Sequence, residues 1–422
     1  TFNDSDAKAF VVDEMFLATY HEISEEVKSR PIEIMADIEH ADYHFLPKIM
    51  APASKELAAV ELKPEDPAMW MYSSGTTGKP KGVVHSQKTI LDAEHLMGDI
   101  MGVGPGDRIF GSSKLFFAYS MGHCFLAPIK LGATIILYPD WPDADAVANI
   151  VKRFEPTILF SVPTFYRNLL RDKAAEKPAF KNVRYYFSAG EKLPRSLFDQ
   201  WMEATGRPVL EGIGATETVF LFLANRPDKL NPGTCGTPTP GTEVKIIGQD
   251  GDLVTEPNKS GVLWVRMACV ASGYWNLKKK TREVFRDGWY CTNDMFTFDE
   301  DGWYEYQGRA DDMLKISGQW VSPTEIEDHV LKNKKVTQAA VVGVANEDGL
   351  VRLALFMVAP EVGDAKAAFE KELTDSLIEN LAVYKCPRRM IFLDEMPLTA
   401  TGKLQRFELR KMAEEQQLAA VS

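Results

Sequence analysis

Residues 72–82 read Tyr-Ser-Ser-Gly-Thr-Thr-Gly-Lys-Pro-Lys-Gly, a polar run between the apolar stretches 68–71 and 83–84. The pattern predicts a strand, a flexible polar loop and a return to regular structure. Glycines let backbone N–H groups turn toward one point, and hydroxyl and ammonium groups add further donors. Such a loop suits an anion with several oxygens, and a polyphosphate suits it best.

Two other kinds of loop share features with this one. It is not a Walker A motif, because Gly75 and Gly78 are only three residues apart and Pro80 replaces the hydroxyl residue. A solvated linker has a similar composition, but the apolar flanks and the lysines Lys79 and Lys81 argue against it. The loop resembles, residue for residue, the phosphate-binding loop of the adenylate-forming superfamily of acyl- and aryl-CoA synthetases, peptide-synthetase adenylation domains and luciferases. The residues implied to bind the nucleotide are Ser73, Ser74, Gly75, Thr76, Thr77, Gly78, Lys79 and Lys81.

The composition limits the class of protein. A chain of 422 residues is expected to divide into two or three domains, and 45% hydrophobic with 26% charged residues is ordinary for a globular protein. No apolar run is long enough to span a bilayer, so no membrane partner is expected. Five cysteines without CxxC pairs indicate reduced thiols and a cytoplasmic location. The net charge of −12 argues against a nucleic-acid partner.

Strands and helices alternate over most of the chain. Short apolar strands are expected at 133–137, 157–160, 183–187 and 208–210, with helices between them and a further helix at 88–101. This alternation favours parallel sheets with helices on their faces. After residue 231, short strands and Asp-Gly turns favour a small antiparallel sheet or barrel.

We therefore predict an α/β fold. Residues 1–311 form a large N-terminal domain of stacked αβ sheets, with a β-barrel-like part at about 232–307, and residues 312–422 form a small α+β C-terminal domain. In the superfamily a longer segment normally precedes the phosphate loop, so the first part of the large domain is expected to lie outside this sequence.

Residues 211–218 read Glu-Gly-Ile-Gly-Ala-Thr-Glu-Thr and follow a predicted strand. Glycines there let a flat ligand lie close to the backbone, and Glu217 is suited to a Mg²⁺ that bridges phosphates. Taken alone, the segment also fits a helix N-terminus capped by Thr216 and Glu217. It resembles the adenine-and-magnesium motif of the superfamily, which implies that Thr216 contacts phosphate, Glu217 binds the metal, and Gly212 and Gly214 border the nucleotide.

Asp294 ends a predicted strand in Thr-Asn-Asp, residues 292–294. A carboxylate at such a place can accept both hydroxyls of a ribose, although most such aspartates only terminate strands. The resemblance implies that Asp294 holds the ribose of ATP and that Arg309 helps. Family members often have Thr-Gly-Asp here, so this chain departs from the pattern at its second residue.

Residues 308–327 resemble the hinge of the superfamily and its adjoining loop. The resemblance implies that the C-terminal domain swings about Asp311, and that Gly318 then borders the tunnel for coenzyme A. Residues 397–403 form a polar loop with one ammonium group, which is usually a surface charge. The resemblance implies that Lys403 is the essential lysine. Its cation would lie between the attacking carboxylate and the α-phosphate of ATP, where two anions come together in the transition state.

Residues 114–122, Lys-Leu-Phe-Phe-Ala-Tyr-Ser-Met-Gly, hold an aromatic stripe that in most proteins is plain core. The string resembles the acid-binding segment of benzoate-CoA ligases, and it lacks the aspartate that binds the amino group in peptide synthetases. The residues implied to line the acid pocket are Phe117, Ala118, Tyr119, Ile213 and Phe220. Some benzoate ligases carry histidine in place of Phe220. His123 is expected to pack and not to catalyse.

Together these motifs predict an ATP-dependent acid–thiol ligase. It would convert a benzoate- or hydroxybenzoate-type acid to its acyl-CoA thioester through an acyl-adenylate, as in aromatic acid degradation. ATP, Mg²⁺ and coenzyme A are the implied cofactors and co-substrates, and the products are AMP and pyrophosphate. A medium-chain or alicyclic acyl-CoA ligase and a non-catalytic nucleotide- or acyl-binding relative remain alternatives, and a homodimer is left open.

Overall fold

The computed structural model describes residues 1–29, 31–74, 80–91, 95–248, 250–316, 319–345, 351–398 and 404–421. The chain forms two compact units. Unit 1 comprises Thr1–Val244 and Val265–Cys291, and unit 2 comprises Lys245–Trp264 and Thr292–Ser422. The sequence analysis placed the domain boundary after Asp311 because the C-terminal domain is expected to swing about that residue. This boundary stays a prediction. No helix within the described ranges is both long and apolar enough to cross a membrane.

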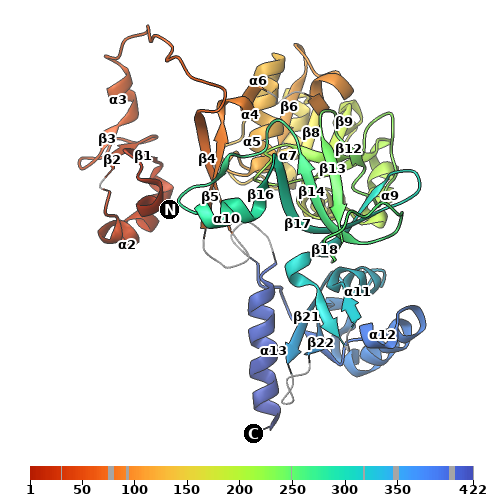
Figure 1. Ribbon diagram of the computed structural model, residues 1–422. Coiled ribbons are helices and arrows are strands. Elements are labelled where there is room, and N and C mark those ends of the chain that lie inside the picture. Colours follow the sequence, from red (N-terminus) through yellow and green to blue (C-terminus); the bar gives the residue numbers. More distant parts are fainter. Residues whose placement is uncertain are drawn as a thin grey trace. The chain divides into compact units, whose positions relative to one another are not determined.

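Figure 1 shows the regular elements of unit 1, coloured along the chain from red through yellow to green. They are α1 (Phe2–Ser5), β1 (Ala9–Val12), η1 (Glu14–Phe16), α2 (Leu17–Ile23), η2 (Ser24–Glu26), β2 (Ile32–Met35), β3 (His44–Phe45), α3 (Leu46–Met50), β4 (Pro67–Ser74), β5 (Pro80–Ser86), α4 (Gln87–Leu91), η3 (His95–Ile100), β6 (Arg108–Gly111), α5 (Ala118–Met121), η4 (Gly122–Leu126), α6 (Ala127–Leu131), β7 (Thr134–Ile136), α7 (Ala144–Phe154), β8 (Ile158–Ser161), α8 (Pro163–Arg171), η5 (Pro178–Asn182), β9 (Tyr185–Ser188), α9 (Arg195–Thr205), β10 (Val209–Gly214), β11 (Leu221–Ala224), β12 (Thr237–Pro238), β15 (Gly273–Tyr274), α10 (Lys278–Val284) and β16 (Phe285–Arg286).

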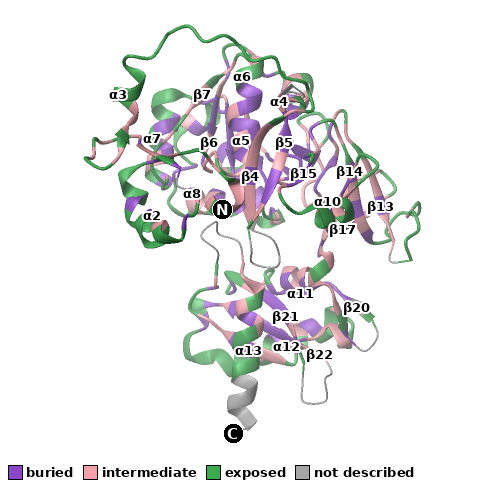
Figure 2. Ribbon diagram, turned by 60° about the vertical axis from the view of Figure 1, so that its left-hand side comes forward, coloured by how far each residue is buried: buried purple, intermediate pink, exposed green. Residues whose placement is uncertain are grey.

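A seven-stranded sheet organises unit 1. Its order is β12-β11-β10-β9-β8-β6-β7, parallel from β10 to β7 and antiparallel at β11 and β12. Successive side chains of a strand point to opposite faces. Phe160 of β8 therefore packs on the face covered by α6, whereas Leu159 packs on the face covered by α7, α8 and α9. The central strands are mostly buried, as Figure 2 shows, while exposed residues predominate on α2 and α3. The predicted α/β fold is confirmed.

One helical run, from residue 118 to residue 131, carries the segment predicted to bind the acid. It consists of α5, the wider π-helical turn η4 and α6. Gly132 ends the run with φ of 73°, a left-handed conformation that costs glycine little. Single π-helical turns inside helices are frequent at functional sites.

The phosphate loop follows β4 and precedes β5, which form an antiparallel hairpin with β15 on the other side of β5. Tyr72 pairs with Gly82, and Ser73 pairs with Lys81. The predicted strand, loop and return to regular structure are thus confirmed at both flanks.

Two expected elements differ in the structure. β10 continues to Gly214 instead of ending at residue 210, because the glycines let it pair with β11. The helix expected at 88–101 is divided into α4 and the π-helical η3, and residues 92–94 between them lie outside the described ranges.

A five-stranded sheet is found where a small antiparallel sheet or barrel was predicted. Its order is β13 (Glu243–Ile247), β14 (Gly261–Arg266), β17 (Trp289–Phe298) and β16, with β18 (Tyr304–Arg309) on β17. β17 is one continuous strand of 10 residues, longer than the short strands expected in this section.

The remaining elements of unit 2 are η6 (Ala310–Asp312), β19 (Leu314–Ile316), β20 (Gln319–Val321), α11 (Pro323–Val330), β21 (Gln338–Ala345), β22 (Val351–Val358), η7 (Pro360–Ala365), α12 (Lys366–Asn380), η8 (Val383–Lys385), β23 (Arg389–Phe392) and α13 (Arg406–Val421). The strands β21, β22 and β23 form a sheet in that order, with α11 and α12 packed on one face and α13 on the other. This is the α+β architecture predicted for the last section.

Candidate active site

Lys81 and Glu217 form a largely buried ion pair. Lys81 lies in β5, which follows the phosphate loop, and Glu217 lies in the turn between β10 and β11. Nζ of Lys81 is 2.9 Å from Oε1 of Glu217, although 136 residues separate them in sequence. The side chain of Glu217 is 7% exposed and that of Lys81 is 22% exposed. The structure thus brings together two motifs that were predicted separately.

Tyr274, at the end of β15, completes this cluster. Its hydroxyl donates to Oε1 of Glu217 at 2.7 Å and accepts from Nζ of Lys81 at 2.9 Å. The ammonium of Lys81 also lies 4.2 Å from the centroid of the tyrosine ring. Sequence analysis missed Tyr274, since it lies 193 residues from Lys81 and no motif that we interpreted contains it.

The charges of this cluster compensate one another. Burial alone would raise the pKa of Glu217, but the Lys81 ammonium and the hydrogen bond from Tyr274 hold it below its usual value. Glu217 is therefore ionised at neutral pH, the form that binds a cation. Removing one partner of a buried pair costs about 3–5 kcal/mol, because the other charge is left uncompensated.

His85 connects β5, the strand after the phosphate loop, to Thr216, the residue predicted to contact phosphate. Its side chain is buried in β5, and Nε2 donates to the carbonyl oxygen of Thr216 at 2.8 Å. Burial lowers the pKa of His85 although the hydrogen bond to Thr216 opposes the shift, so the imidazole is neutral at pH 7. Sequence analysis missed His85. The signal was available, because the period of two along a strand places Lys81 and His85 on one face.

The segment 215–220 is a turn between strands, so the alternative of a capped helix N-terminus is wrong. Val219 has φ of 59° in this turn, a left-handed conformation that is unfavourable for a β-branched residue. The amide of Phe220 donates to the carbonyl of Thr218 at 2.6 Å, which tightens the turn further. Such backbone strain recurs at binding and catalytic sites.

The donor set fits a magnesium ion that arrives with a nucleotide. Within the described ranges, no group of three or more His, Cys, Asp or Glu side chains is placed to hold a metal by itself. Mg²⁺ is commonly bound through one or two carboxylates together with substrate phosphates and water. Glu217 supplies one buried carboxylate, and the Lys81 ammonium stands beside it as the neutralising cation.

The residues predicted to bind the acid fall into two groups. Ala118, Tyr119 and Phe220 pack in one apolar cluster on the sheet. Phe117 instead has its ring 4.4 Å from that of Phe116, which is exposed. The structure therefore brings three of the predicted lining residues together in one cluster, of which Phe117 is not a member.

Gly212, Ile213 and Gly214 lie in β10 and face β11. A Cβ atom on Gly212 would lie 2.9 Å from the carbonyl oxygen of Leu223, and one on Gly214 would lie 2.7 Å from that of Phe220. These glycines therefore permit the close approach of β11. That a flat ligand lies along this backbone, and that Ile213 lines the acid pocket, stay predictions.

Asp294 and Arg309 are partners across β17 and β18. Nη1 of Arg309 lies 2.9 Å from Oδ1 of Asp294 and 3.0 Å from the carbonyl oxygen of Thr292. The departure from Thr-Gly-Asp also has a physical reason. Asn293 has φ of 60°, a conformation that glycine adopts freely and asparagine tolerates better than most residues.

The predicted pivot Asp311 lies in η6, beside a charged network in unit 2. Its neighbour Asp312 accepts from Nη2 of Arg410 at 3.1 Å and lies 3.6 Å from Nε of Arg406. Arg406 also donates to both carboxylate oxygens of Glu327, at 2.6 and 2.9 Å. Burial alone would lower the pKa of Arg406, but the Glu327 carboxylate raises it. This network fixes the start of α13.

Part of the predicted site falls outside the described residues. These positions are Gly75, Thr76, Thr77, Gly78, Lys79, Gly318 and Lys403. Ser74 is described only as the last residue of β4. The hydroxyl of Ser73 is buried and makes no hydrogen bond to any residue whose position is described.

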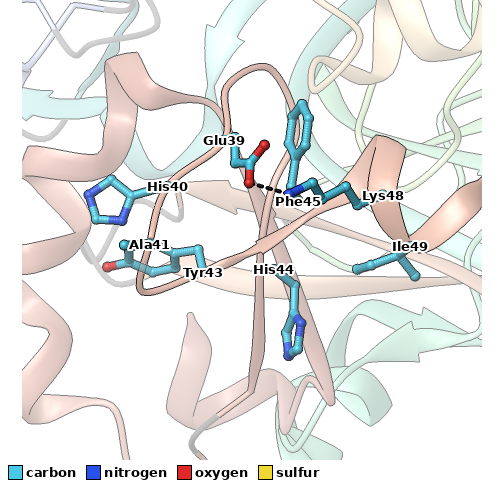
Figure 3. Close-up of a pocket in the computed structure, with 8 residues that line it drawn as sticks. All are labelled: Glu39, His40, Ala41, Tyr43, His44, Phe45, Lys48 and Ile49. Carbon is cyan, nitrogen blue, oxygen red and sulfur yellow. Dashed lines mark hydrogen bonds and ion pairs between the residues drawn. The ribbon is translucent and has the colours of Figure 1, made fainter.

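A shallow hollow of roughly 330 Å³ lies in the N-terminal section, next to β3 and α3 (Figure 3). Its lining includes His40, Tyr43 and His44, and an exposed ion pair joins Glu39 to Lys48 at its edge. The hollow shares no residue with the predicted nucleotide and acid sites, so we assign it no part in them.

The α/β sheet and the joined phosphate-loop and Glu217 motifs define an adenylate-forming enzyme. The chain belongs to the AMP-binding enzyme family: residues 1–275 match that family and residues 325–403 match its C-terminal domain. These matches confirm the predicted superfamily.

Three relatives illustrate the similarity. The 3-hydroxybenzoate–CoA ligase of Aromatoleum sp. (strain CIB) is 44% identical over 97% of this chain and 78% of its own length. The 3-hydroxybenzoate–CoA/4-hydroxybenzoate–CoA ligase of Thauera aromatica is 44% identical over 97% of this chain and 79% of its own. The crystal structure of an anthranilate CoA ligase with anthranoyl-AMP superposes with a TM-score of 0.86 at 33% identity, covering 100% of this chain and 80% of that one. They confirm the predicted class, an AMP-forming acid–thiol ligase.

Proposed function

We propose that this chain converts a benzoate- or hydroxybenzoate-type acid to its CoA thioester in two steps, with an acyl-adenylate as the intermediate. AMP and pyrophosphate are the other products. One observation carries the proposal: the ammonium of Lys81 meets the carboxylate of Glu217 at 2.9 Å, which joins the phosphate loop to the magnesium motif. The names of the similar ligases support an aromatic acid as substrate. The aromatic cluster around Tyr119 favours a planar ring over a flexible aliphatic chain.

In the first step Lys81 exchanges partners. Before nucleotide binds, its ammonium neutralises Glu217. When the triphosphate enters, the ammonium moves to phosphate oxygens, and Glu217, kept in place by Tyr274, is the carboxylate that would hold Mg²⁺. Bound there, Mg²⁺ would neutralise charge on the phosphates. The buried setting strengthens each of these interactions, because little water screens them.

The remaining roles follow the superfamily motifs. Thr216 donates to a phosphate oxygen, Asp294 and Arg309 hold the ribose, and Lys403 neutralises the charge that builds up as the acid attacks the α-phosphate. After pyrophosphate leaves, rotation about Asp311 withdraws Lys403 and brings Gly318 to the coenzyme A tunnel. The thiolate of coenzyme A then displaces AMP and forms the thioester. We place this reaction in the cytoplasm, consistent with five cysteines that form no CxxC pair in the sequence.

The test is exchange of labelled pyrophosphate into ATP, measured with aromatic acids and without coenzyme A. The proposal expects exchange that depends on the acid, and expects Lys403→Ala to lose it at least about a thousandfold while nucleotide still binds. Lys411→Ala, which removes an exposed lysine of α13, is the matched control and should keep full exchange. Acid-dependent exchange that survives Lys403→Ala contradicts the assigned role. Absence of exchange with every acid contradicts the proposed activity. Light scattering tests the homodimer that the sequence left open.

A further inference from the structure

Four aromatic rings from three parts of the chain meet beside the predicted acid pocket. Tyr119 and His123 lie one turn apart on the run from α5 to η4, with ring centroids 5.5 Å apart. Both pack on Phe160 of β8, at 5.8 and 5.4 Å, and His123 also lies 5.4 Å from Phe220. Tyr119 and Phe220 are residues that the sequence assigned to the acid pocket. His123 was assigned only to packing.

Two polar atoms inside this cluster lack a hydrogen-bond partner in the part of the chain that the structure describes. The hydroxyl of Tyr119 and Nε2 of His123 are both buried, and neither makes a hydrogen bond to any residue in the described ranges. The whole side chain of His123 belongs to the interior, since the residue is 1% exposed. Buried polar groups are nearly always paired, because an unpaired one loses its hydrogen bonds to water without replacement. Two such atoms on adjacent rings therefore indicate a ligand group that completes them.

The structure also defines what each atom offers. Nδ1 of His123 lies 3.1 Å from the carbonyl oxygen of Tyr119, so Nδ1 carries the proton and donates it. Burial lowers the pKa of His123 to about 4, which keeps the ring neutral. Nε2 is then a hydrogen-bond acceptor. Burial raises the pKa of the Tyr119 phenol, so its hydroxyl keeps its proton and can donate.

We propose that the ring hydroxyl of a hydroxybenzoate completes this pair, accepting from the hydroxyl of Tyr119 and donating to Nε2 of His123. A single hydroxyl is both acceptor and donor, whereas hydrogen, chlorine or a methyl group at that ring position leaves both protein atoms unpaired. Tyr119 and His123 therefore determine specificity for hydroxylated over unsubstituted rings. This inference rests on the proposed function and narrows its substrate class.

The test compares kcat/KM for benzoate and for 2-, 3- and 4-hydroxybenzoate in the full chain, with pyrophosphate release as the assay. The unmodified protein is expected to prefer one hydroxybenzoate over benzoate by at least about tenfold in kcat/KM. Bound benzoate has no ring hydroxyl, so it would leave two buried polar groups without hydrogen bonds. Tyr119→Phe removes the donor and keeps the ring. It should lower the ratio of kcat/KM for the preferred hydroxybenzoate to kcat/KM for benzoate about tenfold or more. His123→Leu should shift the same ratio in the same direction.

Tyr166→Phe is the matched control. Its hydroxyl is also buried, but it already donates to the carbonyl oxygens of Leu159 and Phe187, at 3.1 and 2.8 Å. This variant should lower the melting temperature and leave the substrate ratio unchanged. Tyr119→Phe should show the reverse, an unchanged or higher melting temperature and a lost preference.

Three outcomes overturn the inference. The first is a protein that uses benzoate as well as every hydroxybenzoate. The second is a Tyr119→Phe variant that loses benzoate and hydroxybenzoate equally, which indicates a structural role. The third is an unchanged preference in both variants, as expected if a buried water satisfies the pair. Failure of the proposed function gives a different result, because then no aromatic acid supports pyrophosphate release at all.

Discussion

The Lys81–Glu217 pair makes a sharp prediction about the protein without ligands. Lys81→Met keeps the length of the side chain and removes its charge, which leaves a carboxylate with 7% exposure without the ammonium that pairs with it among the described residues. Loss of one partner from a buried pair costs about 3–5 kcal/mol. Tyr274 still donates a hydrogen bond to Glu217, so we expect the lower end of this range. At about 2–4 °C per kcal/mol, the melting temperature of unit 1 should fall by roughly 6–12 °C.

Tryptophan fluorescence is a suitable assay for this change. Trp70 stacks on Trp275, the neighbour of Tyr274, with ring centroids 4.1 Å apart, so thermal unfolding of this region should change the emission. Lys88→Met, at an exposed lysine of α4, is the control and should shift stability by no more than about 0.5 kcal/mol.

A second substitution then separates charge from packing. Adding Glu217→Gln to Lys81→Met removes the uncompensated charge, so the double variant should recover most of the loss. The reasoning is refuted if Lys81→Met melts no lower than the Lys88→Met control. It is also refuted if the losses from Lys81→Met and Glu217→Gln simply add.

Three further predictions concern unit 2 and the pH response. Arg406→Leu should lower the free energy of unfolding of unit 2 by about 3–5 kcal/mol in urea, because it removes the guanidinium that pairs with the buried Glu327 carboxylate. A loss below about 1 kcal/mol would contradict this. Asn293→Ala should lower stability by about 1 kcal/mol and Asn293→Gly should cost less, since φ is 60°; the opposite order of melting temperatures would show that the backbone conformation does not matter. Between pH 6.5 and about pH 4 the unfolded chain binds a proton at His123 that the folded protein does not. The free energy of unfolding should therefore fall by up to about 3 kcal/mol as the pH falls through this range. In the His123→Leu variant, the part of the pH dependence of stability that His123 causes should be lost.

Much of the fold could be predicted from local pattern. Short apolar runs between glycine- and proline-rich turns marked the parallel strands, and the polar loop at 72–82 marked the hairpin of β4 and β5. The extent of β10 was missed, because its glycines have poor strand propensity and their fit depends on β11, which comes later in the chain. Pairing with the next strand, β11, decided the extent of β10, not the sequence of β10 itself.

The site was predictable where motifs carried it. Lys81 and Glu217 were assigned separately, and the structure brings them together. Tyr274 escaped detection because its role arises from contacts with Glu217 and Lys81, which lie 57 and 193 residues away in sequence. For His85, the strand period places it on one face with Lys81, but its contact with Thr216, 131 residues away, could not be predicted. For Asn293, only the backbone angle explains why asparagine replaces glycine.

Product analysis tests the central claim most directly. The full chain is incubated with ATP, Mg²⁺, coenzyme A and 3-hydroxybenzoate, and nucleotides and thioester are separated and quantified. An adenylate mechanism yields AMP, pyrophosphate and aroyl-CoA in equal amounts, with AMP formation that requires the acid. Formation of ADP and orthophosphate together with the thioester would contradict it, because attack would then have occurred at the γ-phosphate.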